Sequence, residues 1–119
     1  MHELSIATNI IETVKHIVPE KQWKDIDVIR LKIGTGAGVV ADSLKFSFDA
    51  VKAETKIDNA HLEIESVPFR IHCNSCNEDG ENESGIALCG KCGSADTKII
   101  SGTELIISEI EITEQEVTA

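Results

Sequence analysis

The sequence has few aromatic residues and few basic ones. Aromatic residues make up 3% of the 119 positions and tyrosine is absent, whereas hydrophobic residues make up 41%. We therefore expect a core of Ile, Val, Leu and Ala side chains. Lys and Arg together number 11 against 21 Asp and Glu, which gives a net charge of −10. Because such a chain repels polyanions, we expect no nucleic-acid partner.

Long hydrophobic runs are also missing, and we expect no secretory signal. No apolar run reaches the roughly 18 residues that a membrane span requires, so no membrane partner is expected. The first ten residues, MHELSIATNI, lack the basic start of a secretory signal. The chain has only four cysteines. Reduced, metal-bound cysteines in a chain without a signal indicate a cytoplasmic protein.

The four cysteines form two closely spaced pairs. The pattern is Cys73-x2-Cys76, twelve intervening residues, and Cys89-x2-Cys92. Two such pairs supply four thiolates to one tetrahedral ion, and Zn²⁺ is the ion that this set fits best. Four protein ligands leave no open coordination position, so we expect a structural zinc site. A zinc hydrolase would need an open position and a general base, and the chain is therefore not expected to be an enzyme.

The rest of the chain predicts an α+β fold. Apolar residues at helical spacing predict one helix over residues 2–18 and a second over residues 43–53. Asp42 or Ser43 is the expected N-cap of the second helix. Alternation of apolar and polar residues predicts three strands, at residues 26–33, 60–71 and 104–112.

Two local irregularities accompany these strands. The alternation within residues 60–71 changes phase, which we interpret as a bulge near Ser66, with Pro68 indicating an edge strand. The glycine-rich residues 34–38 lack both the final spacing of a dinucleotide-binding motif and the lysine of a P-loop. We interpret them as a turn between a strand and a helix, not as a phosphate site.

The order of elements places the cysteines in an insertion. The strand at 104–112 needs a sheet to join, and the only predicted sheet precedes the cysteines. The expected architecture is a small mixed three-stranded sheet with two helices, plus an inserted zinc-ribbon-like module. Residues 1–70 and 98–119 would form the α+β domain, and residues 71–97 the zinc-binding module.

The N-terminus is the second chemical feature. The α-amine of Met1, the amide nitrogen of His2 and its imidazole can close chelate rings around one ion. Ni²⁺ and Cu²⁺ can displace the amide proton that such binding requires. The amide of Glu3 or a nearby carboxylate would complete the ligand set. The alternative is that His2 is a solvated residue without a metal role, and the residue chemistry alone favours that alternative.

Four other side chains are weaker candidates. His16 is expected to be a solvated residue at the end of the first helix, and His61 an exposed residue of a strand. His72 adjoins the first cysteine and is a candidate neighbour of a zinc-bound sulfur. Asp42 is either the helix cap or an additional nickel ligand, and we expect the cap.

The opening pentapeptide Met-His-Glu-Leu-Ser resembles the start of the HypA/HybF family, the nickel-insertion accessory proteins of [NiFe]-hydrogenase maturation. The resemblance covers essentially the whole chain. Gly90, where the family often has proline, and Ala37, where it often has serine, are departures that touch no ligand. Further segments that look like the family's landmarks are Ile33-Gly34, Gly38-Val39-Val40, Ser43-Leu44-x-Phe46-x-Phe48, Ala60-x-Leu62-x-Ile64, Cys89-x-x-Cys92-Gly93-Ser94 and Ser101-Gly102-x-Glu104-Leu105.

This resemblance implies a function. It places transported nickel at Met1, His2 and Glu3 and structural zinc at the four cysteines. It implies a nickel metallochaperone whose partners are a hydrogenase large-subunit precursor and a nickel-handling maturation GTPase. The alternative from another class is a zinc-ribbon adaptor that binds proteins and has no nickel role. Nickel binding that requires a free N-terminus separates the two hypotheses.

Overall fold

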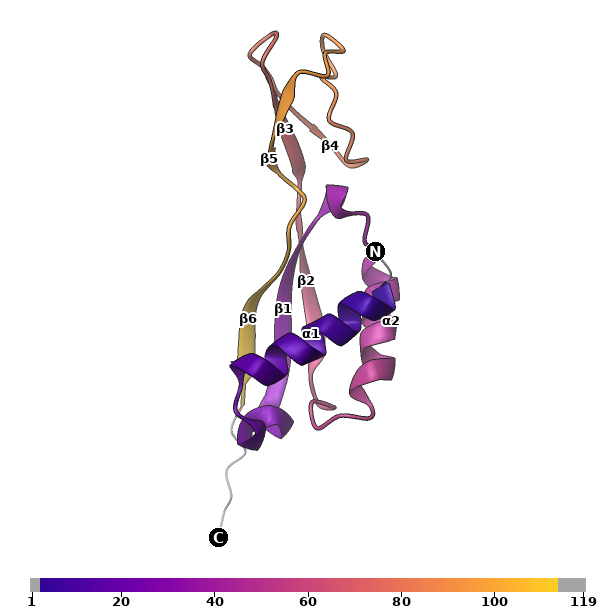
Figure 1. Cartoon of the computed structure of the whole chain (residues 1–119), viewed down its shortest axis with the longest axis vertical. Helices are drawn as coiled ribbons and strands as arrows, with labels where there is room; N and C mark the ends of the chain where they lie inside the picture. The colour runs from indigo at the N-terminus through magenta and orange to yellow at the C-terminus, as the bar shows by residue number, and fades with distance from the viewer. Residues whose placement is uncertain (1–2, 114–119) are drawn as a thin grey trace. The chain divides into compact units, whose positions relative to one another are not determined.

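The computed structural model describes residues 3–113 of the chain (Figure 1). The chain forms two compact units. The first comprises Met1–Leu31, Val39–Ile64 and Ile107–Ala119, and the second comprises Lys32–Gly38 and Glu65–Ile106. Across the described part of the chain, no helix is long and apolar enough to cross a membrane. The predicted α+β class is confirmed, and each unit is described below by itself.

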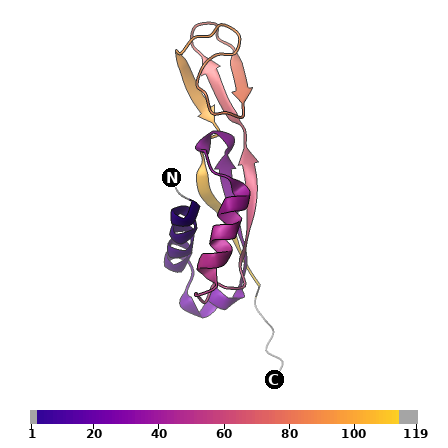
Figure 2. The same ribbon diagram turned by 90° about the vertical axis from the view of Figure 1, so that its right-hand side faces the viewer.

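A mixed sheet supports the helices of the first unit. The strands β1 (Ile26–Gly34), β2 (His61–Val67) and β6 (Leu105–Ile112) form it in the order β2-β1-β6. In Figure 2 the arrows of β1 and β2 point the same way and that of β6 points the opposite way. Helix α2 connects the two parallel strands, as a crossover between parallel neighbours requires.

The first helix follows the predicted apolar stripe. Helix α1 (Glu3–Ile17) has Ile6, Ala7, Ile10, Ile11 and Val14 buried along one face. It packs against α2. Leu4 and Ile17, at its two ends, belong to the same predicted stripe but stay 51% and 61% exposed. The apolar face of α1 is therefore covered in its middle and open at both ends.

Helix α2 (Ala41–Lys52) begins earlier than predicted and without the predicted cap. Val40 occupies the N-cap position, and no side chain there donates or accepts a capping hydrogen bond. Asp42 instead lies in the first turn, where its carboxylate is exposed and interacts favourably with the helix dipole. Leu44 and Phe48 are fully buried on the inner face, which fixes the helix by packing instead of by a cap.

The central strand separates a covered face from a solvated one. Ile29 and Leu31 of β1 are buried, as their alternation predicts. Arg30 points to the other face, where it forms ion pairs with one carboxylate of β2 and two of β6. These carboxylates belong to Glu63 at 2.8 Å, Glu109 at 3.2 Å and Glu111 at 2.9 Å. These ion pairs link β1 to both neighbouring strands on the exposed face of the sheet. Each pair contributes little to the stability of the fold on its own.

A single tryptophan marks the connection between α1 and β1. Trp23 lies in a short 3₁₀ helix (Glu20–Asp25) and is half-buried. Its indole N–H donates a 2.8 Å hydrogen bond to the carbonyl oxygen of Val18. The ammonium of Lys15 lies 5.5 Å from the ring centroid, within the range of a cation–π contact.

The second unit has a sheet of its own, and this corrects one prediction. Its strands β3 (Phe69–Cys73), β4 (Asp79–Asn82) and β5 (Thr97–Ser101) are ordered β4-β3-β5, and both pairings are antiparallel. The predicted single strand over 60–71 with a bulge near Ser66 is wrong. The chain breaks at Pro68 and changes sheet, which accounts for the change of phase.

The glycines of residues 34–38 serve close packing in the second unit. The amide of Gly34 donates to the carbonyl oxygen of Glu104 at 2.8 Å, and that of Gly36 donates to Gly102 at 2.9 Å. A Cβ atom on Gly34 would lie 1.9 Å from the carbonyl carbon and oxygen of Gly102. Such contact with backbone atoms excludes any side chain. The backbones of residues 34–36 and 102–104 thus pack directly against each other. The prediction of a turn did not include this contact.

Gly102→Ala is expected to destabilise the second unit. Gly102 has a φ of +100°, and an added Cβ would lie 2.2 Å from the Cα of Phe69. Strained backbone and forced displacement together cost roughly 2–5 kcal/mol. Urea unfolding of the zinc-loaded protein measures this loss. Gly90→Ala is the matched control, because nothing lies within 4 Å of its Cβ position; equal stability of the two variants would contradict the packing argument.

Candidate metal centre

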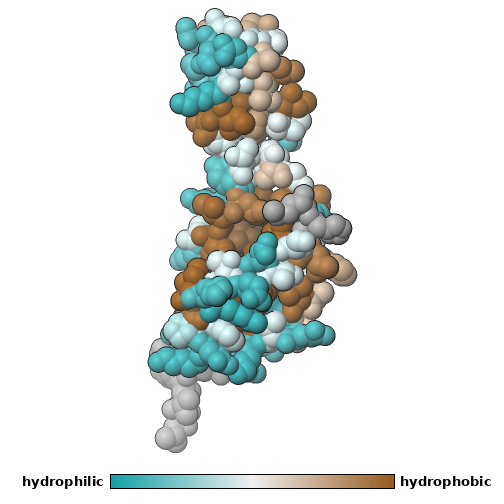
Figure 3. Space-filling model, in the orientation of Figure 1, coloured by the Kyte–Doolittle hydropathy of each residue, from teal (hydrophilic) through white to brown (hydrophobic). Residues whose placement is uncertain are grey.

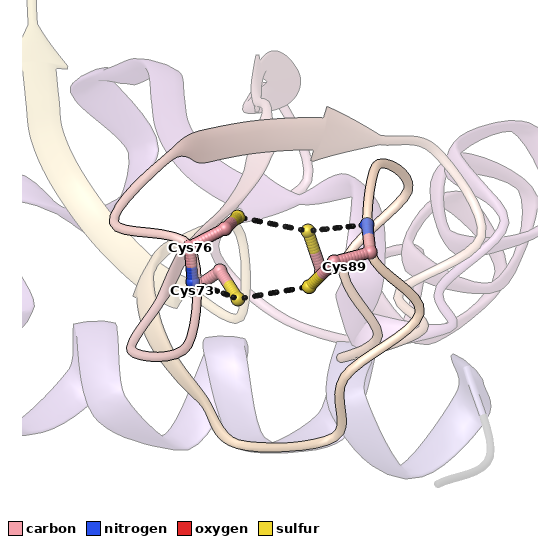
Figure 4. Close-up of side chains that lie close together, drawn as sticks. Cys73, Cys76 and Cys89 are labelled. Atoms are coloured by element: carbon pink, nitrogen blue, oxygen red, sulfur yellow. Dashed lines mark hydrogen bonds between the residues drawn. The ribbon is translucent and has the colours of Figure 1, made fainter.

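The four cysteines converge in the second unit. Cys73 ends β3, and Cys76 follows in the turn toward β4, while Cys89 and Cys92 lie in the loop that leads to β5. The four Sγ atoms all lie within 4.8 Å of one another. Figure 4 shows the sulfur atoms of Cys73 and Cys76 facing those of the second pair across a small central space.

The sulfur separations fit a tetrahedral zinc ion. The Sγ atoms of Cys73 and Cys92 are 3.6 Å apart, and those of Cys76 and Cys89 are 3.7 Å apart. A tetrahedron with Zn–S bonds of about 2.3 Å has edges of about 3.8 Å. A disulfide would need sulfurs about 2.05 Å apart, so these distances exclude one. The donor set and spacing together fit Zn²⁺ with all four positions filled.

The two cysteine pairs have the same local geometry. The amide of Cys76 points at the sulfur of Cys73, and the amide of Cys92 at the sulfur of Cys89, each at 3.4 Å. The residue after each pair has a left-handed backbone, with φ of +58° at Asn77 and +73° at Gly93. Each also donates its amide at 2.9 Å to the carbonyl oxygen of the first cysteine of its pair. Each pair is thus a tight turn that aims two sulfurs at one point.

These amides prepare two of the four thiols, those of Cys73 and Cys89, for metal binding. The backbone N–H groups of Cys92 and Lys91 lower the pKa of the Cys89 thiol to about 6. The backbone N–H of Cys76 likewise lowers the pKa of Cys73. A thiol binds Zn²⁺ as the thiolate, so a lower pKa means that fewer protons must be displaced at neutral pH. The first cysteine of each pair is therefore the readier ligand.

Polar side chains join the two turns beside the metal position. The Ser75 and Ser94 hydroxyls are 2.9 Å apart, and the Asn74 amide donates to the Asp96 carboxylate at 3.2 Å. A third contact is the ion pair of Lys91 with Glu78. None of these contacts was predictable from the sequence, because nothing in the spacing of the cysteines shows which of their neighbours meet.

The remaining histidines stay apart from the metal centre. His72 is half-buried, and its Nδ1 lies 2.7 Å from the Oδ1 of Asp79 on β4, so this nitrogen is directed at a carboxylate and not at a sulfur. His16 is exposed in the last turn of α1, and His61 is exposed at the start of β2, as predicted. Within residues 3–113 the four cysteines are the only such group placed to share an ion.

The proposed nickel ligands are only partly described. Met1 and His2 lie outside the described residues. Glu3 is the first residue of α1, and it lines a groove together with Asp42 of α2. Glu3, whose amide is a predicted nickel ligand, and Asp42, a candidate further ligand, thus line the same groove. The sequence had already made Asp42 a candidate ligand, but the groove that Asp42 shares with Glu3 depends on how the two helices pack.

Comparison with known proteins identifies relatives over nearly the whole chain. The family model for HypA, described as hydrogenase/urease nickel incorporation, metallochaperone, matches residues 1–112. The hydrogenase maturation factor HypA of Roseiflexus sp. is 35% identical over 118 residues, covering 93% of this chain and 91% of the relative. That of Chloroflexus aggregans is 39% identical over 112 residues, covering 93% and 98%.

Solved structures agree on the fold. The solution structure of the nickel metallochaperone HypA from Helicobacter pylori superposes with a TM-score of 0.67 at 21% sequence identity. The match covers 97% of this chain and 100% of that one. A second solution structure of a HypA protein gives a TM-score of 0.66 at 22% identity. At these identities the likeness establishes the architecture, and the sequence relatives carry the family.

Proposed function

Because this chain belongs to the HypA family of nickel-incorporation metallochaperones, we propose that it holds Ni²⁺ at Met1, His2 and Glu3 and delivers it for hydrogenase maturation. The single observation that carries the proposal is the family match, which begins at residue 1 and so includes this tripeptide. The protein acts as a carrier and not as an enzyme. Zn²⁺ at Cys73, Cys76, Cys89 and Cys92 is structural.

The start of α1 suits amide coordination. The first four N–H groups of a helix have no intrahelical acceptor, and α1 begins at Glu3. Metal binding through the amides of His2 and Glu3 therefore breaks no helical hydrogen bond. The positive end of the helix dipole also favours the negative charge that a deprotonated amide carries. Both effects lower the cost of replacing an amide proton by Ni²⁺.

A terminal site also suits transfer. Ligands at the end of a chain are reached from several directions, so a recipient's ligands can replace them one at a time. We propose the hydrogenase large-subunit precursor as recipient and the nickel-handling maturation GTPase as co-worker, both in the cytoplasm, where thiolates stay reduced. Asp42 is an optional further nickel ligand, since its groove also contains Glu3.

The two metals are assigned to different segments. We propose residues 71–97 as the zinc-binding module and residues 1–70 with 98–119 as the nickel-binding domain. The second candidate function is a zinc-dependent adaptor without nickel, which the closed four-thiolate set alone would satisfy. Under the adaptor hypothesis, changes to the N-terminus should have no effect on metal binding.

Extending the N-terminus tests the proposal directly. Two residues added before Met1 convert its amine into an amide, and we expect nickel affinity to fall at least about tenfold (about 1.4 kcal/mol) while zinc content stays at one per chain. Calorimetric Ni²⁺ titration measures the change. The same two residues added after Ala119 are the control. Identical nickel affinity in both proteins would favour the adaptor.

A further inference from the structure

We propose that Cys76 and Cys92, the second cysteine of each pair, form a site of oxidation by hydrogen peroxide at the zinc centre. Each of them is oxidised as a thiolate and then forms a disulfide with the first cysteine of the opposite pair. This reactivity requires the four-thiolate zinc site and does not depend on nickel binding. It makes the zinc content of the protein sensitive to peroxide.

The two cysteines of each pair differ in their access to solvent. Cys73 and Cys89, the first of each pair, are only 1% and 8% exposed. Cys73 is buried because it ends β3 on the inner face of the strand, together with Phe69 and Ile71. The second cysteine of each pair is exposed. A solute therefore reaches the second sulfur of each pair before the first.

The surface around the second cysteines is open and polar. Every residue of 74–80 and of 90–93 is exposed. Figure 3 shows hydrophilic side chains at the end of the second unit where Figure 1 places the cysteine turns. Because hydrogen peroxide is small and polar, a surface of this kind admits it to the sulfurs of Cys76 and Cys92.

Metal binding keeps these exposed sulfurs in their reactive form. A cysteine that binds Zn²⁺ is a thiolate at neutral pH, and the thiolate is the nucleophilic form of the side chain. The Sγ atom attacks one oxygen of hydrogen peroxide, so an S–O bond forms, the O–O bond breaks and hydroxide leaves. The product is a sulfenic acid, which condenses with a neighbouring thiol to a disulfide.

A second thiolate lies close to each exposed sulfur. The Sγ atoms of Cys92 and Cys73 are 3.6 Å apart, and those of Cys76 and Cys89 are 3.7 Å apart. The buried thiolate attacks the sulfenic sulfur, so the S–S bond forms, the S–O bond breaks and a second hydroxide leaves. Each disulfide thus takes two electrons from two thiolates and reduces one peroxide to two hydroxide ions. Because the ion loses two thiolate ligands in this way, zinc is released.

Peroxide treatment of the zinc-loaded protein tests the site without any substitution. With less than one equivalent of hydrogen peroxide and dimedone as a trap for sulfenic acid, peptide mass spectrometry measures the adduct at each cysteine. We expect adducts on the two second cysteines to exceed those on the two first cysteines at least about fivefold. The buried cysteine of each pair is the internal control. Without dimedone, zinc release should accompany disulfides that join the two pairs, and dithiothreitol with Zn²⁺ should restore the site.

Histidine substitution removes the exposed thiolates and keeps a zinc site. Imidazole is also a zinc ligand, so the double variant Cys76→His with Cys92→His retains two thiolates and two imidazoles around the ion. At the same peroxide concentration it should release zinc at least about tenfold more slowly than the wild-type protein. Ser75→Ala, which keeps all four thiolates beside the same turn, is the control and should release zinc at the wild-type rate.

Three results would overturn the proposal. They are equal or greater labelling of the two buried cysteines, disulfides within each pair in place of those between pairs, and zinc release from the histidine variant at the wild-type rate. If the histidine variant holds no zinc, the labelling of the wild-type protein decides. All of these measurements are made on protein without nickel, so their failure is distinguishable from failure of the nickel proposal.

Discussion

Replacing His2 by alanine is expected to abolish specific nickel binding while leaving the zinc content at one per chain. The imidazole closes one of the two chelate rings, so its loss should lower nickel affinity at least about 100-fold, or about 2.7 kcal/mol. The zinc site shares no ligand with the N-terminus, so it should be unaffected. Ni²⁺ titration together with elemental analysis of the same sample measures both results.

His61→Ala is the matched control for His2→Ala. His61 is an exposed histidine of the first unit. The His61→Ala variant should therefore bind nickel with the affinity of the wild-type protein.

In wild-type protein the nickel affinity should fall as pH drops through the range of imidazole and amine groups, roughly 6.5 to 8, because protons compete for these ligands. Cu²⁺ should bind at least as tightly, following the Irving–Williams order. One equivalent of Ni²⁺ bound with unchanged affinity by His2→Ala would refute the N-terminal site.

Replacing Cys73 by alanine is expected to remove zinc and unfold the segment around it. Structural zinc contributes about 10–16 kcal/mol of apparent binding free energy in small zinc modules, more than polar contacts such as the Ser75–Ser94 pair can replace. Zinc content should fall from one per chain to near zero. Amide hydrogen exchange should show lost protection over residues 71–97 and retained protection in α1 and α2.

The Ser75→Ala variant distinguishes the effect of losing the metal from the effect of losing the contacts beside it. This variant removes the 2.9 Å hydroxyl contact to Ser94 and keeps all four thiolates, so it should retain zinc. If Cys73→Ala keeps its zinc and its protection pattern, the four-thiolate assignment is wrong. If instead protection is lost throughout α1 and α2, the first unit depends on zinc, contrary to the separate apolar core seen there.

The elements with a long apolar stripe were predictable from the sequence. Helix α1 was placed within a residue of its observed ends, because its buried face has a period that local reasoning detects. Strand β4 was missed, since its sequence Asp-Gly-Glu-Asn contains no strand-forming residue. It is extended because β3 pairs with it, from Phe69 opposite Asn82 to His72 opposite Asp79. That pairing depends on the cysteine turn and not on the strand's own residues.

The metal centre likewise has features that the sequence predicts and features that it does not. The spacing of four cysteines indicated zinc without a structure, because ligand type and number are written in the sequence. The ion pair of Glu78 with Lys91 was not predictable, since it joins residues beside different cysteine pairs, 13 positions apart in the chain. The close approach of Gly34 to Gly102 was hidden for the same reason. Each glycine looks like an ordinary turn residue until its distant neighbour is known.

Trp23 determines what optical spectroscopy reports about this protein. The chain has one tryptophan and no tyrosine, so nearly all of its near-ultraviolet absorption and emission comes from one indole. That indole is half-buried in the first unit and hydrogen-bonded to Val18. Emission therefore follows the surroundings of the α1–β1 connection. The cysteine-bearing unit has no such chromophore, so a fluorescence melt and a zinc-release curve describe different parts of the chain.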